Sequence, residues 1–233
     1  MIKAEELQSL QSGHRARLRK KFLDDELKDY EILELLLTYA IPRRDVRALS
    51  RQLFNKYGSI PKLLASPIES LMENDGVKEN TATFFKVIHK LTQMEYESKL
   101  KAVPIFHDYN RLINYCKVLL DGKTVEEFHI LYLDGQYRLI KDELHSSGTI
   151  TWAAVYIREI AKKALDLNAQ SIIMIHNHPG SDNTFSQDDI KTTLELEDAL
   201  SKLGITLYDH LLVSSGVFYS ARNMHLLNNI SNH

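Results

Sequence analysis

The sequence has few of the features that would place it outside the ordinary globular proteins of the cytoplasm. It contains a single cysteine, Cys116, which excludes both a disulfide framework and a zinc site built from thiolates. It contains no run of about 18 apolar residues that could cross a membrane. Its first six residues lack the basic-then-apolar pattern of a secretion signal. We therefore expect a cytoplasmic protein with no membrane partner.

The composition is that of one large or two small globular domains. Of the 233 residues, 44% are hydrophobic and 26% are charged. The net charge of −2 argues neither for nor against a nucleic-acid partner. Eight of the ten histidines lie after residue 99. Because histidine is the commonest metal ligand and a frequent acid–base group, we expect any chemistry in the second half of the chain.

The first part of the chain contains helical patterns. Asp24–Ala40 has acidic residues in its first turns and apolar residues at helical spacing. A second helix is predicted over Val46–Tyr57, with Gly58 at the position that commonly follows a helix in left-handed conformation. A tight turn at Asp75–Lys78 then precedes a helix over Thr81–Tyr96.

The second part alternates strands and helices. Two strands at Glu127–Leu133 and Tyr137–Ile140 are followed by a helix, a buried strand at Ser171–Ile175, another helix and two closing strands. This order is that of an α/β or α+β fold with one core, and we predict the α/β class. We divide the chain into a small all-α domain, a linker around Val103-Pro104, an α/β domain and a tail, with the boundaries 1–98, 99–108, 109–225 and 226–233.

The residues that point to chemistry follow the buried strand. His176 and His178 are separated by one residue, so on an extended strand their side chains face the same way, and Pro179 ends the strand. Two imidazoles at this spacing can hold Zn²⁺, and Asp189, at the start of the next predicted helix, can supply a third ligand. A fourth position would stay open for water, as in a catalytic zinc site.

Each part of this pattern also has a purely structural interpretation. An isolated His-x-His pair is more often structural or exposed than metal-binding. Ser186 and Asp189 resemble a capping box, with Asp in the place of the usual Glu. The two interpretations are compatible, because a cap can hold Asp189 rigid while it binds a metal.

The sequence offers two candidates for a general base. Glu126 and Glu127 lie at the start of the first predicted strand of the second half, and hydrolysis at zinc usually needs a carboxylate to take a proton from water. A solvated pair of charges at a strand end is the structural alternative. Spacing alone does not choose between them.

The spacing of these residues resembles a known motif. His176, His178, Ser186 and Asp189 match the JAMM (MPN+) metalloprotease motif. The surrounding stretch HNHPGSDNTFSQDD resembles the RadC family of bacterial proteins. Several shorter stretches carry the same resemblance: Gly13–Leu18, Glu31–Leu37, Ile41–Val46, Leu165–Ala169 and Leu207–His210.

The resemblance implies a fold and a set of roles. The fold would be a cytidine-deaminase-like JAMM/MPN domain behind a helix-hairpin-helix-type domain. His176, His178 and Asp189 would be the zinc ligands, and Ser186 would position the scissile carbonyl or its oxyanion. The activity would be that of a zinc-dependent hydrolase, a metallopeptidase or amidase acting on an unidentified protein or peptide.

The resemblance also ranks the remaining polar residues. The family's upstream glutamate maps onto Glu126 through the pattern E-x-F-x-x-L-x-L-D, and Glu127 is the alternative because strand parity near a bulge varies. Asp209 and His210 fall on a later strand, where one of them would orient a metal ligand. A satisfied pair in the core is the alternative for these two.

A second hypothesis is a DNA-binding or DNA-processing protein, such as a metal-dependent nuclease or a recombination accessory. The basic run Arg15–Lys21 can contact phosphates, although such a run is more often a solvated helix face. The turn Gly76-Val77-Lys78 has lysine where a phosphate-binding hairpin usually has a second glycine. We expect weak, salt-sensitive DNA binding confined to residues 1–98. The intact ligand set disfavours a third hypothesis, an interaction module with an inactive site.

Overall fold

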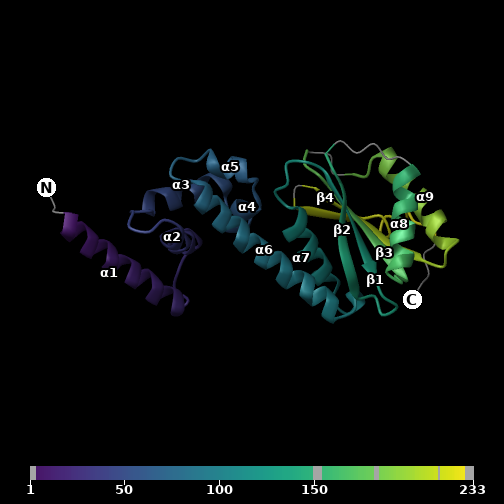
Figure 1. Ribbon diagram of the computed structural model, residues 1–233, viewed down its shortest axis with the longest axis horizontal. Coiled ribbons are helices and arrows are strands. Elements are labelled where there is room, and N and C mark those ends of the chain that lie inside the picture. The colour runs from purple at the N-terminus through teal and green to yellow at the C-terminus, as the bar shows by residue number, and fades with distance from the viewer. Residues whose placement is uncertain (1–3, 149–153, 181–183, 215, 229–233) are drawn as a thin grey trace. The chain divides into compact units, whose positions relative to one another are not determined.

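The computed structural model describes residues 4–148, 154–180, 184–214 and 216–228. The chain forms two compact units, Met1–Lys90 and Leu91–His233, each with a hydrophobic core. Figure 1 shows helices in the first unit and a sheet flanked by helices in the second. This is the mixed α/β domain preceded by helices that the sequence predicts.

The helical unit is built around a core of leucine side chains. Leu33 and Leu37 lie one turn apart on the second helix and pack with Leu53 and Phe85 in one cluster. Fully burying such a side chain contributes about 1.5–3 kcal/mol. The helices that begin in this unit are α1 (Ala4–Leu23), α2 (Asp29–Ala40), α3 (Arg47–Tyr57), α4 (Ile60–Ala65), α5 (Ile68–Met72) and α6 (Glu79–Ala102).

Two left-handed glycines lie where the sequence places turns. Gly58 follows α3 with φ 75°, as predicted. Gly76 has φ 87°, a left-handed conformation that favours glycine, and a Cβ atom added there would also lie in a tight contact, 3.3 Å from a Leu49 methyl group. The predicted helix over 24–40 begins later, at Asp29, because α1 continues to Leu23 and Asp25 takes a left-handed turn between them.

The division of the chain differs from the predicted one. The first unit ends at Lys90 rather than at residue 98, and α6 continues through the boundary without interruption. Within the predicted linker 99–108, Leu100 and Ile105 are buried in the core of the second unit. Leu227, assigned to the predicted tail, is likewise buried against the sheet. Pro104 interrupts the helix, but the apolar residues around it remain packed.

The second unit contains a five-stranded sheet in the order β2-β1-β3-β4-β5. The central strand β3 pairs antiparallel with β1 and parallel with β4, while β2 and β5 are antiparallel edge strands. The elements of this unit after α6 are η1 (Ile105–His107), α7 (Tyr109–Leu120), β1 (Glu127–Leu133), β2 (Leu139–Ser147), α8 (Ala154–Asp166), β3 (Ser171–His178), α9 (Gln187–Ser201), β4 (Thr206–Ser214) and β5 (Val217–Ser220).

Side chains alternate across the sheet, so each central strand fills two cores. On β3, Ile172 and Met174 pack in the core that α8 and α9 cover. Ile173 and Ile175 pack in the core formed with α7 and the end of α6. His176 has the parity of Ile172 and Met174 and therefore lies on the α8–α9 face, at the carboxyl end of the strand.

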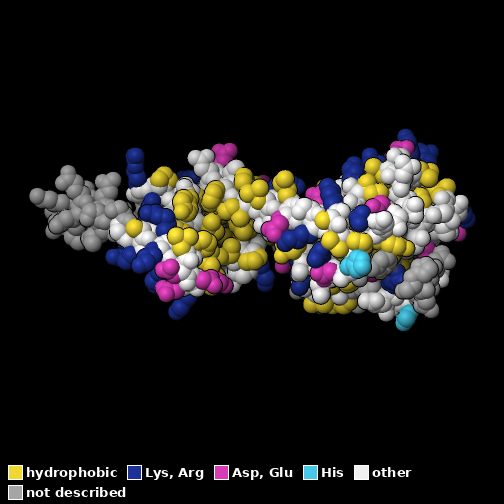
Figure 2. Space-filling view, turned by 90° about the horizontal axis from the view of Figure 1, so that it is seen from below, with side chains coloured by type: hydrophobic (Ala, Val, Ile, Leu, Met, Phe, Trp, Pro, Cys, Tyr) yellow, Lys and Arg dark blue, Asp and Glu magenta, His cyan; other side chains and the backbone are white. Residues whose placement is uncertain are grey.

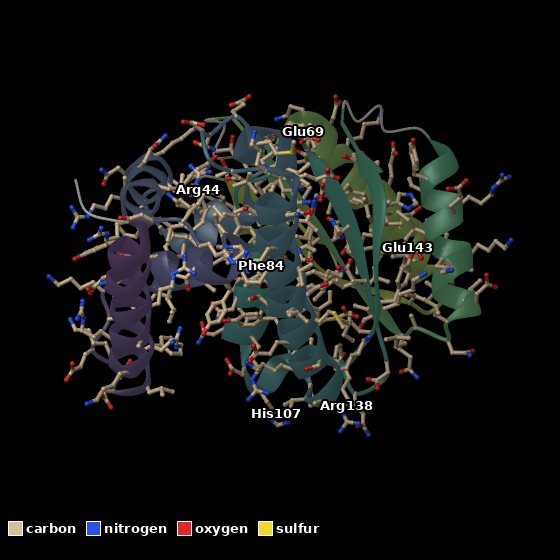
Figure 3. The ribbon with its side chains drawn as sticks, turned by 60° about the vertical axis from the view of Figure 1, so that its left-hand side comes forward. Arg44, Glu69, Phe84, His107, Arg138 and Glu143 are labelled. Atoms are coloured by element: carbon tan, nitrogen blue, oxygen red, sulfur yellow. The ribbon has the colours of Figure 1, made fainter. Side chains whose placement is uncertain are left out.

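Charged side chains also connect the sheet to α8. Glu143 of β2 lies on the side of the sheet that α8 covers (Figure 3), where its carboxylate pairs with Lys141 and lies 3.7 Å from Lys163 of α8. Such partly exposed pairs contribute about 0–1 kcal/mol, so burial in the two cores dominates the stability of this unit. None of the described helices is long and apolar enough to cross a membrane.

Candidate metal centre

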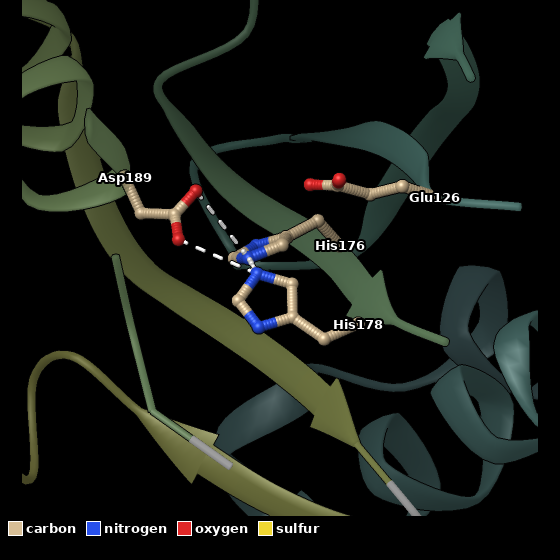
Figure 4. A group of neighbouring side chains, drawn as sticks. All are labelled: Glu126, His176, His178 and Asp189. Atoms are coloured by element: carbon tan, nitrogen blue, oxygen red, sulfur yellow. Dashed lines mark hydrogen bonds and ion pairs between the residues drawn. The ribbon is translucent and has the colours of Figure 1, made fainter. Parts of the chain in front are cut away.

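Four acidic and histidine side chains converge at the end of β3 (Figure 4). His176 and His178 come from β3, Asp189 from the first turn of α9, and Glu126 from the residue that precedes β1. One ligand atom of each lies within 4.8 Å of those of the other three. The fold therefore brings together the three predicted metal ligands and one of the two predicted bases.

The three predicted ligands have the spacing that a metal requires. Nε2 of His176 lies 3.1 Å from Nε2 of His178, and each Nε2 lies 3.5 Å from an oxygen of Asp189. Atoms bound to a tetrahedral zinc at about 2.0–2.1 Å are about 3.3–3.4 Å apart, which matches these distances. Two imidazole nitrogens and a carboxylate suit zinc and other divalent transition metals. The group can hold a divalent metal ion.

Asp189 is held by the cap of α9. The hydroxyl of Ser186 accepts a hydrogen bond from the backbone N–H of Asp189 at 3.1 Å. The Ser186 hydroxyl and backbone N–H both donate to Oδ2 of Asp189 at 2.7 Å. The predicted capping box is therefore confirmed. Because the hydroxyl proton of Ser186 is used on Asp189, its predicted role at an oxyanion stays a prediction.

The Asp189 carboxylate is anionic despite its burial. Desolvation by itself would raise the pKa of Asp189, but the adjacent imidazoles of His176 and His178 and a hydrogen bond from Ser186 hold that pKa far below the usual range. The amino-terminal end of α9 favours a negative charge in the same place. A buried anion that faces two imidazole nitrogens is the arrangement a divalent cation neutralises.

The two candidate bases lie in different surroundings. Glu126 belongs to the group at the end of β3, where burial raises its pKa, partly offset by the nearby histidines. Glu127 accepts a hydrogen bond from Lys123 at 2.8 Å and lies 3.4 Å from Nε2 of His129. Burial alone would raise the pKa of Glu127, but these partners bring it below its usual value. The geometry therefore brings Glu126, and not Glu127, to the candidate metal centre.

Asn177, between the two histidines, was not predicted from the sequence. Its Oδ1 accepts a hydrogen bond from the backbone N–H of Glu127 at 2.9 Å, and its Nδ2 donates to the carbonyl of Val125 at 3.1 Å. The side-chain amide thus replaces a rung of β1–β3 pairing beyond the last paired residues, Phe128 and His176. The one sequence feature that could have indicated this role is the position of a polar residue between two histidines on a buried strand.

Of the two residues expected near a ligand, His210 is the one that contacts it. Nε2 of His210 lies 2.8 Å from Nδ1 of His176. Burial holds the pKa of His210 well below its usual value, so the ring is neutral. Asp209 faces the opposite core, where it accepts hydrogen bonds from Tyr109 at 3.1 Å and Ser220 at 2.7 Å. Asp209 is therefore the satisfied core residue.

A second buried polar group lies on the opposite face of β1. Nδ1 of His129 lies 2.9 Å from Asp142, and the other ring nitrogen faces Glu127. Tyr115 of α7 donates to the same Asp142 carboxylate. Burial alone would lower the pKa of His129, but the two carboxylates raise it above its usual value. This network connects α7 to the sheet on the face away from the candidate metal centre.

The basic run is divided between structural and exposed residues. Arg15 donates to the backbone carbonyls of Thr38, Ile41 and Arg44 at 3.4, 3.3 and 2.7 Å, so it fixes α1 against the end of α2. The remaining basic residues of the run are exposed: Arg17, Arg19, Lys20 and Lys21. Figure 2 shows Lys and Arg side chains gathered on the helical unit.

The second unit is thus an α/β domain with a mixed sheet and a potential divalent-metal site at the end of its central strand. A family model described as a RadC-like JAB domain matches residues 106–226. A UPF0758 protein of Ruegeria pomeroyi is 38% identical over 212 residues, which cover 90% of this chain and 95% of that protein. The chain belongs to the RadC family, as its sequence motifs predict.

Proposed function

We propose that the chain is a zinc-dependent hydrolase of the JAMM type that cleaves an amide bond in a protein or peptide. The convergence of His176, His178 and Asp189 beside Glu126 carries this proposal. The membership of the RadC family, whose matching region is a JAB domain, supports it. A base placed beside three potential metal ligands is the minimum that metal-assisted hydrolysis needs.

His176, His178 and Asp189 would hold the zinc ion. Three protein ligands are the number found in catalytic zinc sites, whereas structural sites use four. When bound, zinc supplies Lewis acidity that polarises a water molecule and the substrate carbonyl.

Glu126 is the residue that moves protons in this proposal. Amide hydrolysis forms a carbon–oxygen bond from water and breaks a carbon–nitrogen bond, so one proton leaves the water and one reaches the leaving nitrogen. Glu126 accepts the first and returns it to the nitrogen. Its raised pKa suits both steps, because the protonated form persists long enough to act as an acid. The pKa of Asp189 is too low for this role.

Ser186 is the proposed donor to the oxyanion that develops on the substrate carbonyl. In the structure its hydroxyl donates to Asp189. In the reaction the hydroxyl would turn to the substrate, while the backbone N–H of Ser186 continues to hold the Asp189 carboxylate.

The first test is the metal content of the purified full-length chain. We expect one zinc ion per chain in the wild type and in Glu126→Gln, and loss of zinc in His178→Ala. The second test is a screen of peptide, isopeptide and branched-DNA substrates. We expect amide cleavage that falls by about 10²–10⁴-fold in Glu126→Gln and persists in the matched variant Glu127→Gln.

The outcomes separate the parts of the proposal. Full zinc retention in His178→Ala would contradict the ligand assignment. Inactivity of Glu127→Gln with an active Glu126→Gln would move the base by one residue. Cleavage of branched DNA without cleavage of any amide would replace the amidase with a metal-dependent nuclease.

A further inference from the structure

We propose that His210 and Thr193 are positioning residues that fix the tautomer of His176, so that the Nε2 lone pair of His176 faces the candidate metal centre. This inference deepens the proposed function and rests on its metal site. It follows from assigning each polar hydrogen in a series of short contacts between Thr193 on α9, His210 on β4 and His176 on β3.

The assignment begins at Thr193. Its hydroxyl lies 2.6 Å from the carbonyl oxygen of Asp189 and 2.6 Å from Nδ1 of His210. A carbonyl oxygen only accepts, so the single hydroxyl hydrogen of Thr193 is donated to Asp189. The contact with His210 must then be a hydrogen bond in which Nδ1–H of His210 donates to the Thr193 oxygen.

The assignment continues through the His210 ring. The His210 ring is fully buried against Phe185 and Phe128, which favours the uncharged ring; with its one hydrogen on Nδ1, its Nε2 has only a lone pair. That lone pair lies 2.8 Å from Nδ1 of His176, so Nδ1–H of His176 must donate to it. A histidine binds a metal as the neutral ring, and with Nδ1–H donated to His210 the neutral His176 ring has no hydrogen on Nε2. This nitrogen is the one that faces His178 at 3.1 Å and Asp189 at 3.5 Å.

The surroundings of the His210 ring are aromatic. The ring is fully buried, with ring centroids 4.9 Å from Phe185 and 6.3 Å from Phe128. The Asp189 carboxylate of the same group faces Nε2 of His176 and Nε2 of His178, each at 3.5 Å. The aromatic walls thus keep the ring neutral, and both of its nitrogens must be satisfied within the protein.

The chain of contacts also connects one potential ligand to another. Thr193 is one helical turn after Asp189 on α9, and its hydroxyl bonds the Asp189 backbone. The opposite end of the chain is His176 on β3. Two elements that supply ligands are therefore held to each other through β4, which fixes both the ring orientation and the lone pair before a metal arrives.

The direct test is the tautomeric state of the histidines in the metal-free full-length protein, measured by nitrogen-15 correlation spectroscopy of the imidazole rings. We expect both His176 and His210 to carry their hydrogen on Nδ1, whereas free histidine prefers Nε2. A ring of either residue in the Nε2–H form would overturn the proposal. This measurement needs neither bound zinc nor activity, so it stands or falls separately from the proposed hydrolase.

A matched pair of variants tests the consequence for metal affinity. Thr193→Val keeps the volume and removes the hydroxyl, and Thr193→Ser restores it. With zinc affinity measured by chelator competition, we expect the valine variant to bind about 10–100-fold more weakly and the serine variant to stay close to the wild type. Equal affinity of the valine variant with unchanged tautomers would contradict a positioning role. If the valine variant does not fold, the tautomer measurement on the wild type decides.

Discussion

The side-chain amide of Asn177 brackets Glu126, because it hydrogen-bonds the backbone on both sides of that residue, at Val125 and Glu127. A third hydrogen bond, from the Gly148 N–H to the Glu126 carbonyl at 2.8 Å, completes the support. The Asn177 side chain points to the face opposite that of the two histidines. The same strand therefore positions potential ligands on one face and the proposed base from the other.

We predict that Asn177→Ala separates metal binding from hydrolysis. Zinc content should stay at the wild-type level, because the Asn177 amide bonds the backbone around Glu126 and not the side chains of the potential ligands. Hydrolysis should fall at least about tenfold, and the free energy of unfolding should fall by about 1–3 kcal/mol, because the buried N–H of Glu127 loses its partner, as does the carbonyl of Val125. Full activity in a destabilised variant would show that the amide only stabilises the fold.

Ser186 can be tested for its two roles separately. Ser186→Ala should lower the free energy of unfolding by about 1 kcal/mol, because α9 loses its cap. At saturating zinc, an oxyanion role predicts a further loss of about 10²–10³-fold in kcat. Ser186→Thr, which keeps a hydroxyl, is the matched control. An unchanged kcat in the alanine variant would leave Ser186 as a helix cap alone.

The buried network around His129 predicts how stability depends on pH. The pKa of His129 is raised in the folded state, so its protonation stabilises the fold below its unfolded pKa of about 6.5, and this contribution is lost as pH rises through the folded value. The lowered pKa of Glu127 acts in the opposite sense: its contribution is present above an unfolded pKa of about 4.3 and is lost in acid.

Urea unfolding at a series of pH values measures this dependence. Between pH of about 6 and 9, the free energy of unfolding of the wild type should fall more steeply than that of His129→Gln. His107→Gln, at an exposed position, is the control and should keep the wild-type slope. Parallel curves for the wild type and His129→Gln would contradict the raised pKa.

Binding of DNA to the helical unit stays a prediction, and the exposed residues of the basic run define its test. Joint replacement of Arg17, Arg19, Lys20 and Lys21 by alanine should weaken binding to duplex DNA and reduce its salt dependence, by about 0.9 in the logarithmic slope for each phosphate that is no longer neutralised. Joint replacement of four exposed lysines outside the run, Lys28, Lys62, Lys90 and Lys99, is the control for net charge. An equal fall in affinity in both sets would show that the run is not a specific binding surface.

The potential ligands could be predicted from the sequence because short-range features, strand periodicity and a helix cap, fix their positions. The period of two along a strand puts His176 and His178 on one face, and the cap of α9 fixes Asp189. Spacing could not choose between Glu126 and Glu127, because they differ by one residue across a strand with irregular register. Only the pairing of β1 with β3 decides which glutamate reaches the site.

Contacts between distant elements were beyond sequence reasoning. Thr193 and His210 meet because α9 packs on β4, a contact no local pattern encodes. A weak signal was available for Thr193, which follows Asp189 by one helical turn. The polar group around His129 had a similar signal, since Glu127 and His129 share one face of a strand that otherwise carries apolar residues.

The position of β3 in the middle of the sheet has a consequence for the lifetime of the site. A strand paired on both sides and packed on both faces exchanges its amide hydrogens only when the whole domain opens. His176 is paired on both sides of that strand, so local fraying does not release it, whereas His178 is the last residue of β3 and pairs with β4 alone. Loss of a bound ion from an intact domain would therefore begin at His178 or Asp189, and His176 would stay in place for recapture.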